Sequence, residues 1–139
     1  MVQSRTSHFP SLISKNYSGL NNANRTILSG DGSINKRLIY LLVNLDQVGS
    51  FDGSSLITAP GDATGLFVKC ALSYASPGGR SIALAGSDAV SGGIASDLTA
   101  LSYISIGSVN GSEVMCGWIR SFVYYPTRLT NAQIKTLST

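Results

Sequence analysis

The most regular hydrophobic pattern in the chain is the alternation of apolar and polar positions across residues 65–74. Within it, one side would carry Leu66, Val68, Cys70, Leu72 and Tyr74, and the other side Lys69, Ala71 and Ser73. Because the side chains of a strand alternate between its two faces, a period of two over this length predicts a strand with one face in a core.

Shorter apolar runs between turn residues predict the other strands. These runs cover residues 25–29, 36–43, 54–58, 81–85 and 103–107. The run at residues 81–85 follows a Pro-Gly-Gly turn and would pair with residues 65–74 as a hairpin. The stretches at residues 46–61 and 88–100 are rich in Gly, Ser and Asp, so they are predicted to be mainly loop.

An aromatic run at residues 118–125 (WIRSFVYY) predicts the last strand. Aromatic and β-branched residues favour a half-buried strand. Pro126 has no N–H to donate to a ladder, so it should end this strand. With the runs above, this makes about six or seven strands, which indicates an all-β sandwich or jelly roll.

A helix-start signal follows Pro126. Thr130 and Gln133 have the spacing of a capping box, in which each side chain bonds the backbone of the other residue. Leu129 and Ile134 have the spacing of a hydrophobic staple. The chain is therefore predicted to close with one short C-terminal helix.

The end of the chain resembles a known family. Tyr124, Tyr125 and Pro126 followed by Arg128 and Leu129, then a capping Thr and a short helix, are similar to the end of a concanavalin A-like lectin/glucanase jelly roll of the laminin-G-like type. The closest likeness is to such domains in bacteriophage tail and virion proteins, and it extends from about residue 25 to residue 139. The resemblance implies an antiparallel β-sandwich with one short C-terminal helix. It does not fix a function, because this fold hosts lectins, glycosidases and structural modules.

Residues 1–24 are polar, rich in Ser and Asn, and weakly patterned. We expect them to form either an N-terminal arm or an irregular edge strand, with residues 2–9 as a strand that stops at Pro10. Full domains of the family are longer at the N-terminus. The resemblance therefore implies that residues 1–24, or a neighbouring subunit, supply the early strands of a domain at residues 25–139, and that the protein is a homo-oligomer, with a trimer favoured.

Composition excludes several classes of protein. The chain has 139 residues, enough for one domain with its own core, and no apolar segment of the roughly 18 residues that span a bilayer. Charged residues make up only 12% of the chain, and the net charge is +3. The basic residues are scattered, with only Lys36 and Arg37 adjacent, so we expect no nucleic-acid binding.

The residues predict no enzyme active site. Glycoside hydrolysis needs two carboxyl groups that face each other across a sugar, and no two acidic residues are spaced i, i+2 on a predicted strand. The only histidine, His8, lies in the weakly patterned N-terminal stretch, and there is no Gly-x-Ser-x-Gly motif. The acidic residues are Asp31, Asp46, Asp52, Asp62, Asp88, Asp97 and Glu113.

No resident cofactor or metal site is predicted. The family resemblance leaves Ca²⁺ open as an alternative, since related domains hold it with loop oxygens, and the loop oxygens here include Asp52, Asp88, Asp97 and Asn110. Cys70 and Cys116 are interpreted as buried thiols in strands, and a disulfide between them stays open because sequence does not supply the geometry.

Glycan binding would use exposed aromatic residues that stack on sugar rings, helped by a polar group. The candidates by residue type are Trp118, Tyr125, Arg120 and Tyr103. The competing interpretation is that aromatic residues on a terminal strand belong to the core or to a subunit contact. A β-bulge near Ile119 would place Ile119, Phe122 and Tyr124 inside and leave Arg120 outside.

The resemblance implies a non-enzymatic structural or adhesion module of a bacteriophage tail fibre, spike or related virion protein. Its partners would be other virion proteins, further copies of itself and a host-surface glycan, and its place would be the virion, assembled in the host cytoplasm without membrane insertion. An alternative is a capsid decoration protein of the same fold. A third is a carbohydrate-active enzyme.

Overall fold

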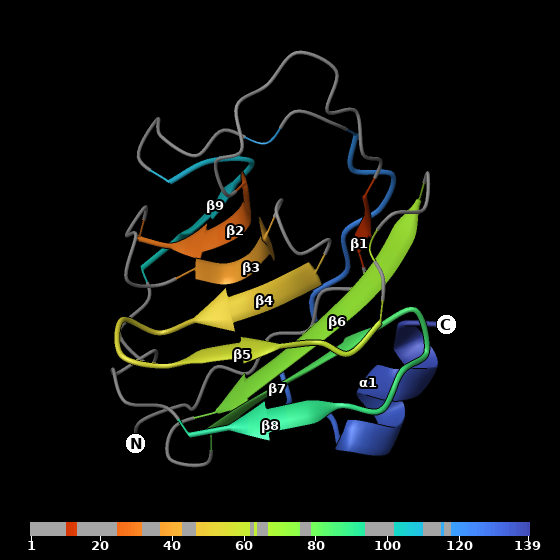
Figure 1. The fold of residues 1–139 in the computed structure, drawn as a ribbon. Coiled ribbons are helices and arrows are strands. Elements are labelled where there is room, and N and C mark those ends of the chain that lie inside the picture. Colours follow the sequence, from red (N-terminus) through yellow and green to blue (C-terminus); the bar gives the residue numbers. More distant parts are fainter. Residues whose placement is uncertain are drawn as a thin grey trace.

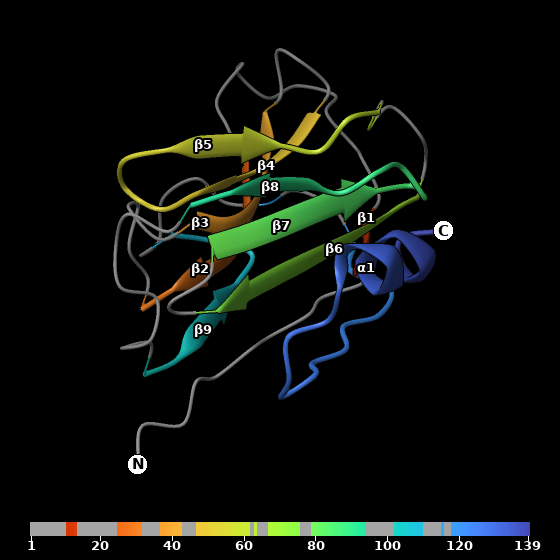
Figure 2. The ribbon, with the colours of Figure 1, turned by 90° about the horizontal axis from the view of Figure 1, so that it is seen from below.

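The computed structural model describes residues 11–13, 25–31, 37–42, 47–61, 63, 67–75, 79–93, 102–109, 115 and 118–139. Two antiparallel β-sheets stack face to face, and one short helix lies against the outer side of the smaller sheet (Figures 1 and 2). The all-β sandwich with a C-terminal helix is therefore confirmed. Within these residues, no helix has the length and apolar character needed to cross a membrane.

The smaller sheet has the strand order β1-β6-β7-β8 and the larger one the order β5-β4-β3-β2-β9. The strands of the smaller sheet are β1 (Ser11–Ile13), β6 (Val68–Ala75), β7 (Gly79–Leu84) and β8 (Val90–Gly92). Those of the larger sheet are β2 (Arg25–Gly30), β3 (Arg37–Leu42), β4 (Gln47–Phe51), β5 (Leu56–Thr58) and β9 (Ile104–Ile106). The helix α1 spans Asn131–Leu137.

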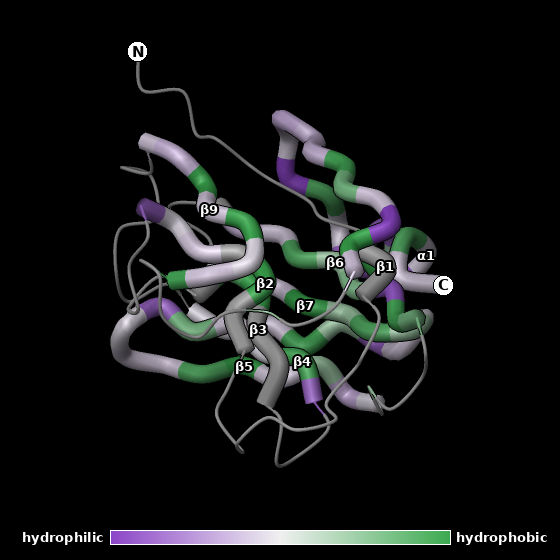
Figure 3. Tube along the Cα trace, turned by 90° about the horizontal axis from the view of Figure 1, so that it is seen from above, coloured by the Kyte–Doolittle hydropathy of each residue, from purple (hydrophilic) through white to green (hydrophobic). Residues whose placement is uncertain are grey.

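The main core fills the space between the two sheets. On β6, the alternation puts Val68, Cys70, Leu72 and Tyr74 into this core, as predicted. Residues from the larger sheet, among them Ile27, Ile39 and Val48, are fully buried against them. In Figure 3 hydrophobic positions lie along the strands of both sheets.

The second face of β6 is also buried, contrary to the prediction of a strand with one core face. Ala71 on β6 and Ala83 on β7 form a second cluster with Ile134 of α1, and all three are fully buried. Ser73 is buried there too, whereas Lys69 on the same face is exposed. The small side chains of this face let the helix approach the sheet closely, which a strand alternation alone does not reveal.

Helix α1 begins as predicted. The Gln133 N–H donates to Thr130 Oγ1, and the Thr130 N–H donates to Gln133 Oε1, so the capping box is complete. Leu129 packs against the same cluster as Ile134, which is the predicted hydrophobic staple. The cap satisfies backbone donors that the first helical turn leaves without intrahelical partners.

Two strands, β4 and β8, lie where loops were predicted, within residues 46–61 and 88–100. Strand β5 lies within the strand predicted at residues 54–58 and forms a hairpin with β4. Strand β4 is buried at Val48, Gly49 and Ser50 although only one of these is a large apolar residue. Its place between β3 and β5 buries it through tertiary contacts, so its own sequence carries a weak strand pattern.

The last predicted strand, at residues 118–125, is absent. Ile119 forms a single isolated bridge, and residues 120–125 have no regular secondary structure. Helix α1 packs on strand β6, and β6 already pairs with β1 on one side and β7 on the other. The segment that leads to α1 therefore has no free side of β6 to pair with. Because these residues form no strand, the predicted β-bulge is also absent. Ile119 is partly buried and Arg120 is exposed, as expected. Phe122 and Tyr124, which were predicted to lie inside, are 37% and 45% exposed.

The N-terminal stretch supplies one described strand, β1, which follows Pro10. It pairs antiparallel with β6 of its own chain, with Ser11 opposite Cys70. The strand predicted at residues 2–9 and the histidine His8 lie outside the described residues, as do Cys116, Asp46, Asp62, Asp97, Asn110 and Glu113. The division at residue 24 stays a prediction.

Candidate functional site

An exposed aromatic segment, residues 118–125, is the most prominent surface feature of the described chain. Trp118 is 74% exposed, and Phe122, Val123 and Tyr124 are each more than a third exposed. In Figure 2 the blue chain that precedes α1 projects from the sandwich beside the helix. Large aromatic side chains left in water at neighbouring positions are a common mark of a binding surface.

The segment is held at both ends. Ile119 packs against the main core between the sheets. Beyond the segment, Leu129 packs against the second core cluster, and its carbonyl oxygen accepts a hydrogen bond of 3.2 Å from Ser73 Oγ on β6. The exposed residues between these two anchors are therefore presented by the rigid sandwich.

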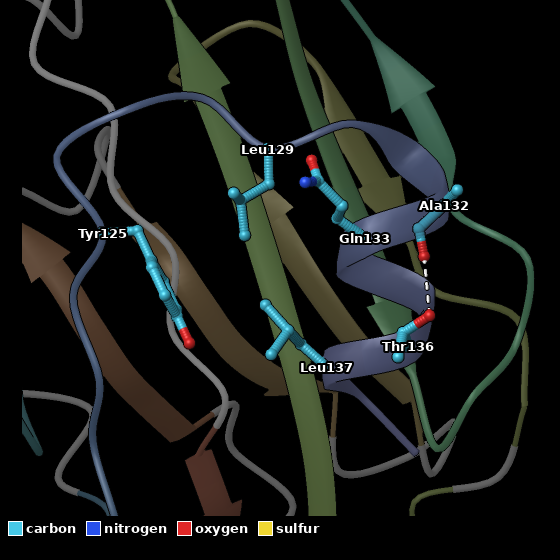
Figure 4. Close-up of a pocket in the computed structure, with 6 residues that line it drawn as sticks. All are labelled: Tyr125, Leu129, Ala132, Gln133, Thr136 and Leu137. Carbon is cyan, nitrogen blue, oxygen red and sulfur yellow. Dashed lines mark hydrogen bonds between the residues drawn. The ribbon is translucent and has the colours of Figure 1, made fainter.

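A groove of about 400 Å³ lies between the end of this segment and α1. Its lining residues are Tyr125, Leu129, Ala132, Gln133, Thr136 and Leu137. Figure 4 shows the Tyr125 ring on one side, with Leu129 and Leu137 extending toward it from the side of the helix. We call this the Tyr125 groove. It offers an aromatic ring and aliphatic walls, with a few polar atoms nearby.

The polar groups of the groove are already ordered by the helix. Gln133 Oε1 accepts from the Thr130 N–H at 2.8 Å, and Thr136 Oγ1 donates to the Ala132 carbonyl at 3.1 Å. A hydroxyl that donates to a carbonyl still has lone pairs with which to accept. Thr136 can therefore accept from a ligand hydroxyl without breaking the helix.

The structure brings only part of the predicted site together. Tyr125 is half-buried and lines the groove, while Trp118 and Arg120 are exposed on the segment that leads to it. Tyr103 is 57% exposed but precedes β9, at the edge of the other sheet. Figures 1 and 2 both show β9 well away from α1, and Tyr103 is not among the residues that line the groove.

Sequence reasoning missed the helical side of the groove. The sequence assigns Leu129 and Gln133 only to the staple and the capping box, roles that they do have, and it assigns no role to Leu137. The i, i+4 spacing of Gln133 and Leu137 on the predicted helix was the available signal. These residues border a groove only because residues 118–125 run beside the helix. No local sequence pattern indicates that path.

The candidate calcium ligands that the structure describes have other partners. Asp52 is fully buried with Oδ2 at 3.4 Å from Arg80, and Asp88 lies 2.6 Å from Lys135 Nζ. The hydrogen bond and the charge of Lys135 hold the pKa of Asp88 below its ordinary value of 3.8. Among the described residues, no group of three or more His, Cys, Asp or Glu side chains could hold a metal ion.

No family model and no curated protein matches the chain. One solved structure is similar: the CBM40 carbohydrate-binding module of the Ruminococcus gnavus IT-sialidase, bound to α2,6-sialyllactose. The TM-score is 0.54 at 13% sequence identity, over 99% of this chain and 84% of the other. The likeness supports a lectin-like β-sandwich fold.

Proposed function

We propose that this protein is a non-enzymatic glycan-binding module, and that residues 118–125 and the Tyr125 groove form its binding surface. The observation that carries the proposal is the 74% exposure of Trp118 beside Ile119, which is packed on the core. Exposing a large indole to water costs free energy, and the cost is recovered when a ligand covers the ring.

The chemistry of this surface suits a sugar. One face of a pyranose ring is lined by C–H groups and stacks on an aromatic ring, while its hydroxyls need hydrogen-bond partners. Trp118 and Tyr125 supply aromatic rings, and Gln133 and Thr136 are the polar residues among those that line the groove. Sites with apolar walls and a few oriented polar groups are the usual form of small-ligand sites.

The comparison supports the same proposal at the level of the fold. The similar sialidase module is a carbohydrate-binding domain and not a catalytic one. Of the three acidic residues that the structure describes, Asp52 and Asp88 each face a basic side chain, and Asp31 Oδ1 accepts hydrogen bonds from the backbone N–H groups of Ser102 and Tyr103. A module that binds without cleaving agrees with both observations.

We further propose that the module works in a bacteriophage particle, as the resemblance of residues 124–129 to laminin-G-like virion domains implies. Repetition in a homo-oligomer, with a trimer favoured, would multiply weak single-site contacts with a host-surface glycan. Light scattering on the purified protein tests the oligomer. A monomer at micromolar concentration would contradict it.

Capsid decoration is the second candidate function. Leu56 on β5, Val90 on β8 and Ile106 on β9 are 46%, 36% and 55% exposed, on the edge strands of the two described sheets. Exposed edge strands with apolar side chains can accept a strand from another protein. In this alternative the protein would bind other virion subunits and no glycan.

A glycan array with wild-type protein, Trp118→Ala and Tyr125→Ala tests the first proposal. Loss of either ring should weaken binding to the selected glycan about tenfold, the effect expected for a central aromatic contact. Phe67→Ala is a matched control, because Phe67 is 52% exposed and lies outside residues 118–139. A blank array together with tight capsid binding would favour decoration, and polysaccharide depolymerisation would contradict a non-enzymatic module.

A further inference from the structure

The formal net positive charge of the protein equals the charge of residues 118–139. Of the ten Lys and Arg residues, three lie in residues 118–139, which contain none of the seven Asp and Glu residues. The rest of the chain therefore has seven basic and seven acidic residues and is formally neutral. The formal net charge of +3 is carried by Arg120, Arg128 and Lys135 alone.

All three of these cations lie at the surface. Lys135 Nζ lies 2.6 Å from Asp88 Oδ1. Arg120 and Arg128 are exposed, and each is next to an anchor of the exposed aromatic segment: Arg120 follows Ile119, and Arg128 precedes Leu129. In the sequence, the two arginines therefore flank the span that contains Phe122, Tyr124 and Tyr125.

We propose that the glycans bound here are acidic, carrying carboxylate or sulfate groups that Arg120 and Arg128 recognise while the aromatic rings between them stack on the sugars. This inference rests on the proposed glycan-binding function and names its ligand class. A guanidinium presents paired donors whose fork matches the two oxygens of a carboxylate or sulfate. Charge complementarity would also raise the association rate and exclude neutral competitors.

An acidic glycan fits this surface better than a nucleic acid does. Nucleic-acid binding relies on neutralising many closely spaced phosphates, and the region offers two arginines at opposite ends of a nine-residue span, residues 120–128. An extended chain of that length reaches at most about 30 Å. Sparse charges separated by aromatic rings match a polymer in which charged groups alternate with uncharged sugar surface.

Calorimetric titration with matched probes tests the inference. Galacturonate oligomers are compared with their methyl esters, which keep the rings and lose the charge, and dextran sulfate is compared with dextran. The variants are Arg120→Gln, Arg128→Gln and the control Lys69→Gln, which removes one exposed positive charge outside residues 118–139. Single-stranded DNA of similar length is the competing polyanion.

We expect at least one acidic probe to bind about tenfold more tightly than its neutral partner, the effect of one charge-assisted contact. Arg120→Gln and Arg128→Gln should each remove most of this difference, while Lys69→Gln retains it. A preference for galacturonate over its methyl ester indicates recognition of carboxylate, and a preference for dextran sulfate over dextran indicates recognition of sulfate.

Three results would overturn the inference: equal affinity for acidic and neutral partners, an equal loss in Lys69→Gln, or tighter binding to DNA than to either acidic glycan. Binding of neutral glycans alone would reject the acidic ligand class and leave the proposed function in place. Absence of binding to every glycan on the array and in the titrations would reject both.

Discussion

At the scale of single residues, the main surprise is a charged side chain between the sheets. Arg80 on β7 pairs with Tyr74 on β6 and is 1% exposed. Its guanidinium lies 3.4 Å from Asp52 Oδ2 and donates to Ser55 Oγ at 2.8 Å. Because Asp52 and Ser55 belong to the turn between β4 and β5, this buried pair connects the smaller sheet to the larger one.

Asp52 is held by its own turn as well. Its Oδ1 accepts hydrogen bonds from the backbone N–H groups of Ser54 and Ser55 at 3.1 and 2.8 Å. A buried carboxylate needs such donors to offset the loss of water around it. Removing the arginine would leave this carboxylate buried beside an empty space.

We therefore expect Arg80→Ala to lower the free energy of unfolding by about 3–5 kcal/mol, the usual cost of removing one partner of a buried ion pair. Urea denaturation measures it. Lys69→Ala is the control on the adjacent strand, where the side chain is exposed, and should change the stability by no more than about 0.5 kcal/mol. Similar losses in both variants would show that the pair has no structural role.

The surface pair of Asp88 and Lys135 predicts a pH dependence. The hydrogen bond and charge of Lys135 lower the pKa of Asp88 from its ordinary 3.8, so folding favours the ionised carboxylate. The resulting stabilisation is present above the unfolded pKa and is lost as the pH falls through the folded value. Because both side chains are exposed, the contribution is small.

Asp88→Asn should therefore melt slightly below the wild type at about pH 7, and the two melting temperatures should coincide at about pH 2, where Asp88 is protonated. Thermal melts followed by circular dichroism across this range test the prediction. A difference that grows as the pH falls would have the wrong sign and would contradict it.

At the scale of elements, α1 depends on the sheet it covers. Isolated helices of this length are unstable in water, and seven residues form barely two turns. Ile134 is the fully buried residue of the helix and packs against Ala71 and Ala83. Two hydrogen bonds add to this contact. Asn131 Nδ2 donates to Ser91 Oγ on strand β8, and the Gly86 N–H in the turn between β7 and β8 donates to Ser138 Oγ.

Ile134→Ala should reduce the free energy of unfolding by about 2–5 kcal/mol, because it deletes a buried side chain whose place the small alanines cannot fill. The matched control is Thr136→Ala on the same helix, where the side chain is exposed and the expected change is within about 0.5 kcal/mol. Chemical denaturation compares the two. An Ile134→Ala protein as stable as its control would mean that the helix contributes nothing to the fold.

At the scale of the whole molecule, the two sheets meet closely at one edge. Strand β8 of the smaller sheet lies against β5 of the larger one, and a Cβ atom added at Gly92 would lie 2.5 Å from Ile57 Cγ2. Such a distance is shorter than any real contact between carbon atoms. Gly92 is therefore the residue that allows this edge of the sandwich to close.

Gly92→Ala should destabilise the protein by about 1–3 kcal/mol, the typical cost of overpacking. In an Ile57→Ala background the obstructing methyl group is gone, so the same substitution should cost clearly less. A double-mutant cycle measured by denaturation reports this coupling. If the changes in unfolding free energy of the two substitutions were strictly additive, Gly92 and Ile57 would not be in steric contact.

Local patterns predicted the elements that local chemistry controls. The alternation was confirmed at residues 68–74, and so was the capping box of Thr130 and Gln133. Strand β4 and the path of residues 118–125 were not predicted. An aromatic run has the composition of a strand, but it forms one only where it pairs with a neighbouring strand, and β6 beneath α1 already has partners on both sides.

By itself, the sequence determined the class of fold and the closing helix, since the period of apolar positions and the positions of caps and turns are properties of neighbouring residues. Only the tertiary structure decided which side chains remain in water. Trp118 is exposed, Tyr125 borders a groove and Arg80 is buried with Asp52, and these outcomes depend on segments distant in sequence. The candidate site is made of such outcomes, because exposure results from the packing of the whole chain.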